Sequence, residues 1–592
     1  MSLSPTDRAG GADGLAGFLS RHRVLLCLIG LTAIGLVLRL WWLDARGLTH
    51  PEIYVPGLDL PPGISEPPPR HDLATALDFH FHDEPHPLGW YLAMFGWVRL
   101  FGTSEWALRL PSALFGAAAI PVIYLLGTEA YDRVTGLGAA ALLTAHGMLV
   151  FWSQAARMYV PGFFFAALSL WLLLRCTHGP RRRPGAEIGY LVAVWAGVET
   201  TDLFWPFLML QVAWALMVLP ATERFRLADA ARARFSGAHR VIQLQAVALM
   251  ISVPELLHDI YLARGTGAPP PSLGFPRDYL SLGFIASRGD NALVETLPWQ
   301  GLRLVVLALC LGLMLLGARR PAASPAAASP SGPDLPRWLP LPVALAMTAL
   351  SVWLALIARH RTGPLLLIAM GPLLSLTLPA ISRLISGLAA PLQRRCRLAG
   401  PRLLLLVTGL VGPALLFLLS FGMSVLAPRA FLVFVPPLLV LTAAGAAALL
   451  RGRLSEPLLA PVLALGLLLL SAASLPYMMT DPGSPRDYRG LGRALAAALE
   501  PGDLVLVRDR HWQDTPLFYY LPDADYVTRD YGAALAARPG ARVWVVTWPG
   551  EGPEGSKSDA LDPERQAALA GWHQVGAVTA WHAEAALYEA GP

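Results

Sequence analysis

The stretch VLLCLIGLTAIGLVLRLWWL at residues 24–43 decides the fold class, because it runs for twenty residues with one charge, Arg39. A helix needs about 20 apolar residues to cross the hydrocarbon core of a membrane. The stretch is longer than the apolar region of a cleavable signal peptide, and no small-residue cleavage site follows it. It therefore predicts a retained first membrane span.

The composition of the whole chain agrees with this interpretation. Hydrophobic residues make up 55% of the 592 residues and charged residues only 15%, against roughly 25% charged in an average globular protein. So few charges could not cover the surface of a soluble protein of this size. The composition excludes a disordered chain, a disulfide-rich secreted domain and most nucleic-acid-binding proteins, so we expect no nucleic-acid partner.

Further apolar runs predict about thirteen transmembrane helices. They lie near residues 24–43, 107–127, 133–151, 155–175, 187–203, 205–220, 241–258, 300–318, 338–358, 363–383, 402–422, 431–450 and 457–476.

The positions of the arginines predict how the bundle is oriented, because basic residues gather on the cytoplasmic side. With Arg21 and Arg23 inside, the arginine-rich connectors all fall on that side, which makes the N-terminus cytoplasmic. We therefore predict a cytoplasmic N-terminus at 1–23, a transmembrane region at 24–476 with an external loop at 44–106, and an external domain at 477–592. The arginine-rich, lysine-poor composition is typical of a GC-rich bacterium, so the predicted location is the bacterial inner membrane.

The segment after residue 477 differs in kind from the rest. A helix-like run near 487–499 is followed by strand-like runs at 503–508 and 541–547 and by an alternating pair at 572–589. Helices that alternate with apolar strands predict a small α/β domain. The predicted fold is therefore an all-α polytopic membrane protein of about thirteen helices with a small external C-terminal α/β domain.

The first external loop is dense in titratable residues. Within it, Phe79-His-Phe-His-Asp-Glu-Pro-His-Pro87 brings Asp83, Glu84 and His86 together and is stiffened by two prolines. Titratable groups gather at functional sites, but they also occur in ordinary solvated loops. From the residues alone, this segment could be either part of an active site or an ordinary solvated loop.

Three motifs carry a resemblance to a known family. The motifs are LFGTSEWALRLPSALFG at 100–116, preceded by His86-Pro87 and Trp90-Tyr91; FWSQAARMY at 151–159; and DYRG at 487–490. In this order they resemble elements of the bacterial GT-C glycosyltransferases, the relatives of protein O-mannosyltransferases and of lipid A aminoarabinose transferase.

The resemblance implies the transfer of one sugar from a polyprenyl-phosphate donor to a lipid, glycan or protein acceptor at the external membrane face, with inversion at the anomeric carbon. Membrane lipids and a cell-envelope acceptor are then the expected partners. Such chemistry needs a carboxylate as general base toward the acceptor hydroxyl. It also needs cationic or metal groups that hold the departing lipid phosphate.

The identity of the general base is open. The family has an Asp-Glu pair shortly after the first span, and counting from Arg39 puts Pro51 at the Asp position and Glu52 at the Glu position. Glu52 could act in its place, Asp83 or Glu84 could supply the base instead, or activity could be lost.

The resemblance also concerns the phosphate and a metal ion. A divalent metal ion of unknown identity could bridge Glu84 or His86 and the phosphate, although His86 could equally be a turn residue. For the lipid phosphate, the motif at 151–159 indicates Gln154, Arg157 and Tyr159. If this segment is helical, Gln154 shares a face with Arg157, and Tyr159 points elsewhere.

Three further arginines are candidates for the phosphate: Arg359, Arg361 and Arg429. All three lie on the predicted external side, where a lone arginine can also simply extend to the interface. Arg429 lies in a stretch, 424–437, that resembles the family's Pro-Arg-Tyr-Leu element, with Ala430 in place of the tyrosine.

Two other classes compete with the glycosyltransferase. A transporter or flippase of lipid-linked substrates would suit a long bundle with buried arginines, but we find no inverted repeat of broken spans. A catalytically inactive membrane scaffold is kept open by the proline at position 51.

Overall fold

The computed structural model describes most of the chain. The described residues are 9–55, 57–58, 72–82, 86–177, 183–218, 244–245, 247–253, 255, 300–319, 400–420, 428–472, 475, 487–508, 514–548 and 562–591. The chain divides into two compact units. The bundle unit comprises residues 1–41, 85–90 and 111–480, and the sheet unit comprises residues 42–84, 91–110 and 481–592.

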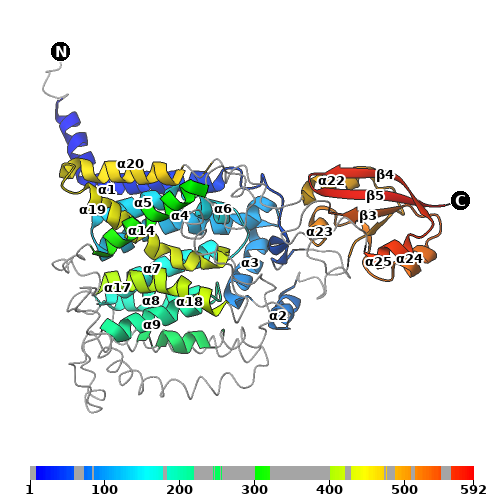
Figure 1. The fold of residues 1–592 in the computed structure, drawn as a ribbon, viewed down its shortest axis with the longest axis horizontal. Helices are drawn as coiled ribbons and strands as arrows, with labels where there is room; N and C mark the ends of the chain where they lie inside the picture. Colours follow the sequence, from blue (N-terminus) through cyan, green and yellow to red (C-terminus); the bar gives the residue numbers. More distant parts are fainter. Residues whose placement is uncertain are drawn as a thin grey trace, which may run out of the picture. The chain divides into compact units, whose positions relative to one another are not determined.

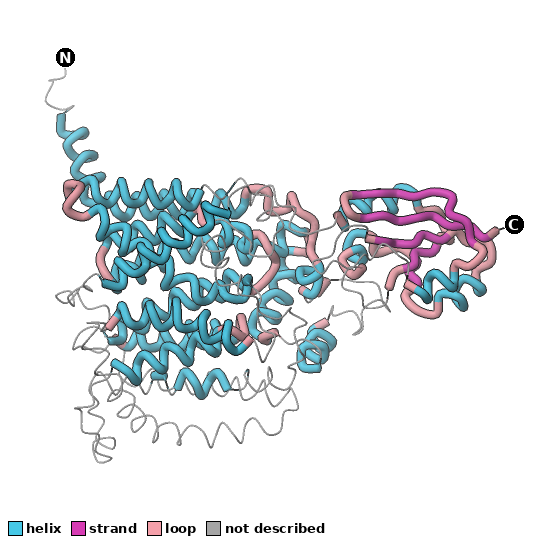
Figure 2. The backbone as a smooth tube through the Cα atoms, in the orientation of Figure 1, coloured by secondary structure: helices cyan, strands magenta, loops and turns pink. Residues whose placement is uncertain are grey.

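In its described residues, the bundle unit is built from helices that are joined by short turns and links (Figures 1 and 2). Its elements are α1 (Ala9–Leu40), most of α4 (Glu105–Ala130), α5 (Arg133–Thr144), α6 (Gly147–Ser153), α7 (Tyr159–Thr177), α8 (Pro184–Val198), α9 (Phe204–Val218), α14 (Gln300–Arg319), α17 (Pro401–Leu406), η4 (Val407–Val411), α18 (Gly412–Leu419), η5 (Pro428–Phe434), α19 (Val435–Leu450) and α20 (Glu456–Ala472).

Several of these helices can cross a membrane. Among the described residues, four helical stretches are long and apolar enough: Glu105–Ala130, Tyr159–Thr177, Pro401–Leu418 and Phe431–Leu450. The bent pair of α5 and α6 makes a fifth if it forms one span. The prediction of a mostly helical, multi-pass membrane protein is confirmed. The spans predicted at 338–358 and 363–383 lie outside the described residues.

One predicted span differs from a single helix for a local reason. The run at 133–151 forms α5 and α6, which are bent by 58°. At the bend, the Arg39 guanidinium donates to the carbonyl oxygens of Leu143 and Thr144, at 3.2 and 3.1 Å. Arg39 is fully buried, so this bend is held by a charge on another helix.

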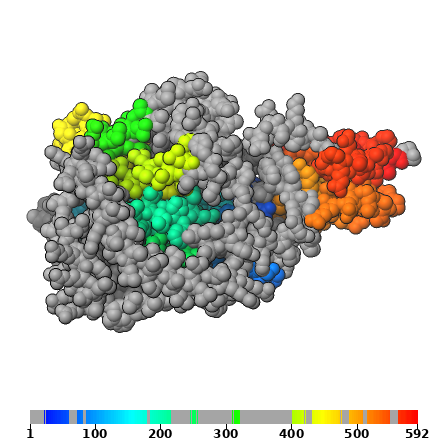
Figure 3. All heavy atoms as spheres, turned by 60° about the horizontal axis from the view of Figure 1, so that its bottom comes forward, coloured from blue at the N-terminus to red at the C-terminus, as the bar shows by residue number. Residues whose placement is uncertain are grey.

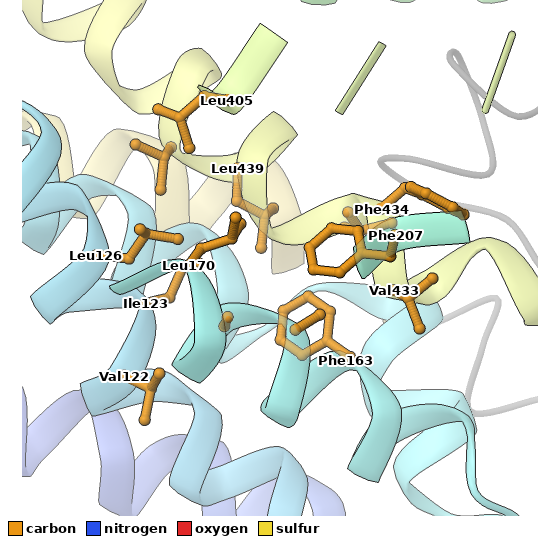
Figure 4. Close-up of a cluster of buried hydrophobic side chains, with 14 of the residues drawn as sticks. Val122, Ile123, Leu126, Phe163, Leu170, Phe207, Leu405, Val433, Phe434 and Leu439 are labelled. Carbon is orange, nitrogen blue, oxygen red and sulfur yellow. The ribbon is translucent and has the colours of Figure 1, made fainter. Parts of the chain in front are cut away.

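The core of the bundle unit is built from interlocking apolar side chains (Figure 4). Phe207 of α9 meets Phe434 of η5 edge to face, with ring centroids 5.7 Å apart. Two glycines bring α14 and α19 into backbone contact. A Cβ on Gly445 would lie 1.8 Å from the Leu313 carbonyl oxygen, and one on Gly317 would lie 2.2 Å from that of Leu441. Small residues at helix crossings are typical of membrane bundles.

The sheet unit contains a five-stranded sheet with strand order β2-β1-β3-β5-β4. Strands β2, β1 and β3 are parallel, and β5 and β4 continue the sheet antiparallel. The elements are η2 (His50–Tyr54), α2 (Leu73–His82), most of α3 (Leu88–Phe101), α22 (Tyr488–Ala498), β1 (Leu504–Leu506), α23 (Leu517–Tyr520), β2 (Asp525–Val527), α24 (Tyr531–Ala537), β3 (Val543–Thr547), α25 (Pro563–Ala568), β4 (Trp572–Ala580) and β5 (Ala583–Ala590).

The small α/β domain predicted for the C-terminal segment is therefore present as a sheet with helices. Every residue of β1, and Val543 through Val546 of β3, are buried, as expected for central strands between helices. Strand β4, at one edge of the sheet, has no buried residue, and its neighbour β5 is buried only at Ala583, Ala585 and Ala586. They form the red end of the chain in the space-filling view (Figure 3).

Candidate functional site

Arg157 lies in a short non-helical link between α6 and α7. Helix α6 ends at Ser153, and α7 begins only at Tyr159. The Ser112 hydroxyl of α4 donates to the Arg157 carbonyl oxygen at 2.8 Å, which holds the backbone of the link. The helical spacing that grouped Gln154 with Arg157 does not apply, because the residues between them are not helical.

His86 is the partner that the structure brings to Arg157. The Arg157 Nη2 atom lies 3.0 Å from the Nε2 atom of His86. A guanidinium nitrogen can only donate, so His86 accepts at Nε2 and carries its ring proton on Nδ1. Two motifs that are 71 residues apart in the sequence therefore meet inside the bundle unit. His86 therefore contacts Arg157, and it also lies in the turn before α3, together with Pro87.

Tyr159 completes this group. The central guanidinium carbon of Arg157 lies 5.9 Å from the centroid of the Tyr159 ring, within the range of a cation–π interaction. The ring also meets Trp152 edge to face at 5.1 Å. We call His86, Arg157 and Tyr159 the arginine–histidine site. Tyr159 thus lies with Arg157, which differs from the expectation that it would point elsewhere.

Gln154 contacts the backbone at the end of α1. Its side-chain amide donates to the Trp41 carbonyl oxygen at 2.8 Å and lies 3.2 and 3.3 Å from those of Leu38 and Arg39. Two of these carbonyls belong to the last turn of α1, and the third belongs to the residue directly after it. Gln154 therefore fastens the end of α1 to the residues that precede Arg157.

Glu52 lies in the sheet unit, in the short helix η2. Its Oε1 atom accepts from Arg109 Nε at 2.8 Å, and its Oε2 atom accepts from Arg109 Nη2 at 2.9 Å. Oε2 also accepts from the backbone amide and the hydroxyl of Thr49, at 2.9 and 3.1 Å. Only 3% of the Glu52 side chain and 2% of the Arg109 side chain are exposed. This carboxylate is buried and engaged on both oxygens.

Four of the predicted site residues lie outside the part of the chain that the structure describes: Asp83, Glu84, Arg359 and Arg361. For Arg429 only the backbone is described, within η5. That element packs against α7, the helix that begins with Tyr159.

The described residues do not form the predicted metal site. Among them, no group of three or more His, Cys, Asp or Glu side chains could hold a metal ion. His86 Nε2 faces the Arg157 guanidinium, a cation, so this nitrogen is not a fitting ligand for a metal ion. The prediction for Glu84 lies outside the described residues.

Sequence reasoning missed how the motif at 100–116 works. Glu105, Arg109, Ser112 and Gly116 follow one another at spacings of four, three and four, which puts them on one face of α4. In the sheet unit, Glu105 binds Arg489 and Arg109 binds Glu52. In the bundle unit, Ser112 holds Arg157. The polar spacing on an otherwise apolar helix was the signal that could have revealed these partners.

Comparison with known proteins supports the resemblance. The family model of dolichyl-phosphate-mannose-protein mannosyltransferases matches residues 83–258, a stretch that contains His86, Arg157 and Tyr159. The resemblance to this group of glycosyltransferases, predicted from the motifs, is confirmed over that stretch. No curated protein sequence matches the chain.

The chain is also similar to solved structures. One is ArnT from Cupriavidus metallidurans bound to undecaprenyl phosphate, with 17% identity and a TM-score of 0.43 over 94% of this chain and 97% of that one. Another is AglB from Archaeoglobus fulgidus, with 12% identity and a TM-score of 0.46 over 96% and 74%. The mycobacterial arabinofuranosyltransferase AftD has 15% identity and a TM-score of 0.43 over 95% and 41%. At these values no residue-by-residue correspondence follows.

Proposed function

We propose that the chain is an integral-membrane glycosyltransferase that moves one sugar from a polyprenyl-phosphate donor to an acceptor. The observation that carries this proposal is the contact between His86 and Arg157. It joins two of the motifs on which the resemblance depends, and both lie within the stretch that the family model matches.

Arg157 suits the phosphate of such a donor. Its guanidinium is permanently charged and presents N–H donors in a planar fork that matches a phosphate bidentately. The side chain is half-buried, and the His86 contact and the Tyr159 ring limit its rotation. A cation fixed before the reaction stabilises the charge that develops on the leaving phosphate.

The reaction is a single displacement. The acceptor oxygen bonds to the anomeric carbon on the face opposite the phosphate, while the bond from that carbon to the phosphate oxygen breaks. The electron pair leaves with the polyprenyl phosphate, and the acceptor proton passes to a carboxylate. This sequence inverts the anomeric centre and needs one base and one phosphate-binding cation.

We assign the base to Asp83 or Glu84, with Glu52 as the alternative. A general base must reach the acceptor proton within hydrogen-bond distance. Glu52 is almost fully buried and accepts two hydrogen bonds from Arg109, which favours a structural role for it. Asp83 and Glu84 immediately precede the Pro85-His86 pair in the sequence.

The remaining parts of the proposal come from the sequence. They are about thirteen spans, a cytoplasmic N-terminus, an external face for the reaction, an external C-terminal domain at 477–592 and a bacterial inner membrane. Arg359, Arg361 and Arg429 are proposed as further contacts to the lipid phosphate. We also propose a divalent metal ion at Glu84, which no step above requires. The acceptor is a lipid, glycan or protein of the cell envelope.

The proposal is tested by turnover. Purified protein in lipid would be given a panel of radiolabelled polyprenyl-phosphate sugars with envelope acceptors. We expect one donor to be consumed by the wild type, and Arg157→Ala to abolish its consumption. Arg175→Ala is the matched control, because Arg175 lies at the far end of α7 and pairs with Glu129 at 3.9 Å. Failure of every donor, with and without added divalent metal, would contradict the proposal.

A further inference from the structure

Residues 43–47 of the sheet unit form a turn that follows α1 in the sequence. We call it the carbonyl turn. Arg109 of α4 donates through Nη1 to the carbonyl oxygens of Leu43 and Arg46, at 3.0 and 2.7 Å. Through Nη2 it donates to that of Gly47 at 2.9 Å. The guanidinium that binds Glu52 therefore also holds the backbone of the turn.

A second arginine holds the same turn from the C-terminal segment. Arg489 of α22 donates to the carbonyl oxygens of Asp44 and Arg46 at 2.6 and 2.8 Å, and lies 3.4 Å from that of Ala45. Its guanidinium is also paired with the carboxylate of Glu105. All five carbonyls of the turn are thus engaged by two guanidinium groups, which share the carbonyl of Arg46.

A tyrosine reinforces this attachment. The Tyr520 hydroxyl of α23 donates to the Glu105 carboxylate and accepts from the backbone amide of Leu48. The neighbouring Tyr519 donates to the Thr103 carbonyl oxygen at 2.8 Å. The side chains of Arg489 and Glu105 are 19% and 12% exposed, so their pair is shielded more than an ordinary surface ion pair.

The position of Arg489 on α22 is set by its neighbours in the motif DYRG. Asp487 caps the helix by accepting from the Gly490 amide at 2.7 Å. A Cβ at position 490 would lie 2.1 Å from the Asp487 Oδ2 atom, so a larger residue there would displace the capping carboxylate. Tyr488 is buried and meets Trp548 edge to face at 4.9 Å. The cap and the buried ring anchor the residue that reaches the carbonyl turn.

We propose that Arg489 and Tyr520 are positioning residues, through which the C-terminal segment holds the carbonyl turn at the start of the loop 44–106. Hydrogen bonds from charged donors fix a loop more firmly than neutral ones. A loop fixed before substrate arrives lowers the cost of reaching the reactive geometry. The catalytic consequence rests on the proposed transferase activity, whereas the holding of the turn does not.

Amide hydrogen exchange on the whole protein tests the holding of the turn directly. We expect Arg489→Ala to speed exchange in peptides covering residues 43–55 by at least about tenfold, because the turn then opens locally. Tyr520→Phe should raise exchange chiefly at Leu48, whose amide loses its acceptor. Arg538→Ala is the control, since Arg538 forms an exposed pair with Asp525.

Turnover tests the catalytic consequence. We expect Arg489→Ala to lower kcat about tenfold or more, as for a misplaced positioning contact, and to leave the donor KM unchanged, because the proposed phosphate contacts belong to the bundle unit. Arg489→Lys keeps the charge but not the planar fork, and should recover only part of kcat.

The outcomes separate the two claims. Exchange at 43–55 that is equal in wild type, Arg489→Ala and Tyr520→Phe would overturn the positioning role, whatever the activity. Faster exchange with unchanged kcat would show that the turn is held but does not serve catalysis. Faster exchange in a protein that turns over no donor would leave the attachment standing and remove the proposed function.

Discussion

Glu52 and Arg109 form a buried, two-point ion pair, with the Arg109 Nε and Nη2 atoms at 2.8 and 2.9 Å from the two carboxylate oxygens. The same guanidinium binds three carbonyls of the carbonyl turn. A carboxylate that pairs with a buried cation in this way stabilises the fold. Glu52 is also the acid nearest in sequence to the position where the resembled family carries its general base. Its two alternative roles, structural partner of Arg109 or general base, can be told apart by mutation.

Removing either member of this pair should destabilise the protein. We expect Arg109→Ala to cost about 3–5 kcal/mol, because it leaves a buried charge without its partner. Glu52→Gln should cost less, since the amide still accepts one hydrogen bond. Thermal unfolding in detergent measures the destabilisation in both variants. Asp525→Asn is the control, because Asp525 pairs with Arg538 at an exposed position. Glu52→Gln with an unchanged thermal midpoint but no turnover would identify Glu52 as the base.

The two acids that precede His86 in the sequence should behave in the opposite way. We expect Asp83→Asn or Glu84→Gln to lower kcat by about 10²–10⁴-fold, the usual contribution of a general base, with the thermal midpoint unchanged. Steady-state kinetics of both variants beside Glu52→Gln would decide among the three acids. Full activity in both would return the assignment to Glu52.

The planar fork of Arg157 should matter as well as its charge. Arg157→Lys keeps the charge but cannot bind a phosphate bidentately. We therefore expect the donor KM to rise about tenfold, which corresponds to about 1.4 kcal/mol. His86→Asn, which can still accept from the guanidinium, should have the smaller effect. Equal donor KM values in Arg157→Lys and the wild type would argue against a phosphate at this site.

The contact between the C-terminal segment and the carbonyl turn should weaken at alkaline pH. Burial, together with the nearby charge of Glu105, raises the pKa of Tyr519 from 10.0 to about 12, and burial and Glu105 also raise the pKa of Tyr520. The folded protein keeps these protons after the unfolded chain has lost them. The stability that these two protons contribute is therefore fully present below about pH 10 and is lost as the pH rises through the raised pKa values.

Tyr520→Phe provides the check on this pH dependence. The thermal midpoint of the wild type should fall as the pH rises from about 10 to about 12, the window set by the raised pKa of Tyr519. The thermal midpoint of Tyr520→Phe should be lower than that of the wild type at neutral pH and should fall less steeply as the pH rises. Parallel curves for the two proteins would show that the Tyr520 proton does not contribute.

Local patterns in the sequence predicted the local structure well. The run at 487–499 forms α22, and the runs at 503–508 and 541–547 contain β1 and β3. The alternating pair at 572–589 forms β4 and β5. Strand β2 was missed because it has only three residues and none of them is buried. Apolar periodicity reports burial, so it does not reveal a short edge strand.

What could not be predicted depends on partners that are distant in the sequence. The break between α5 and α6 is held by Arg39, about a hundred residues earlier. Glu52 and Arg109 are 57 residues apart, and Glu105 and Arg489 are 384 apart. A single sequence shows that such charges must find partners in an apolar chain, but it does not show which ones.

The most direct test of the central claim is the binding of a polyprenyl phosphate without its sugar to the purified protein. Titration calorimetry in nanodiscs would compare the wild type with Arg157→Ala and with the control Arg175→Ala. The account predicts saturable binding by the wild type and the control, and at least about a tenfold loss in Arg157→Ala, the effect of removing a charged hydrogen bond to the phosphate. Binding that is equally tight in all three proteins would contradict it.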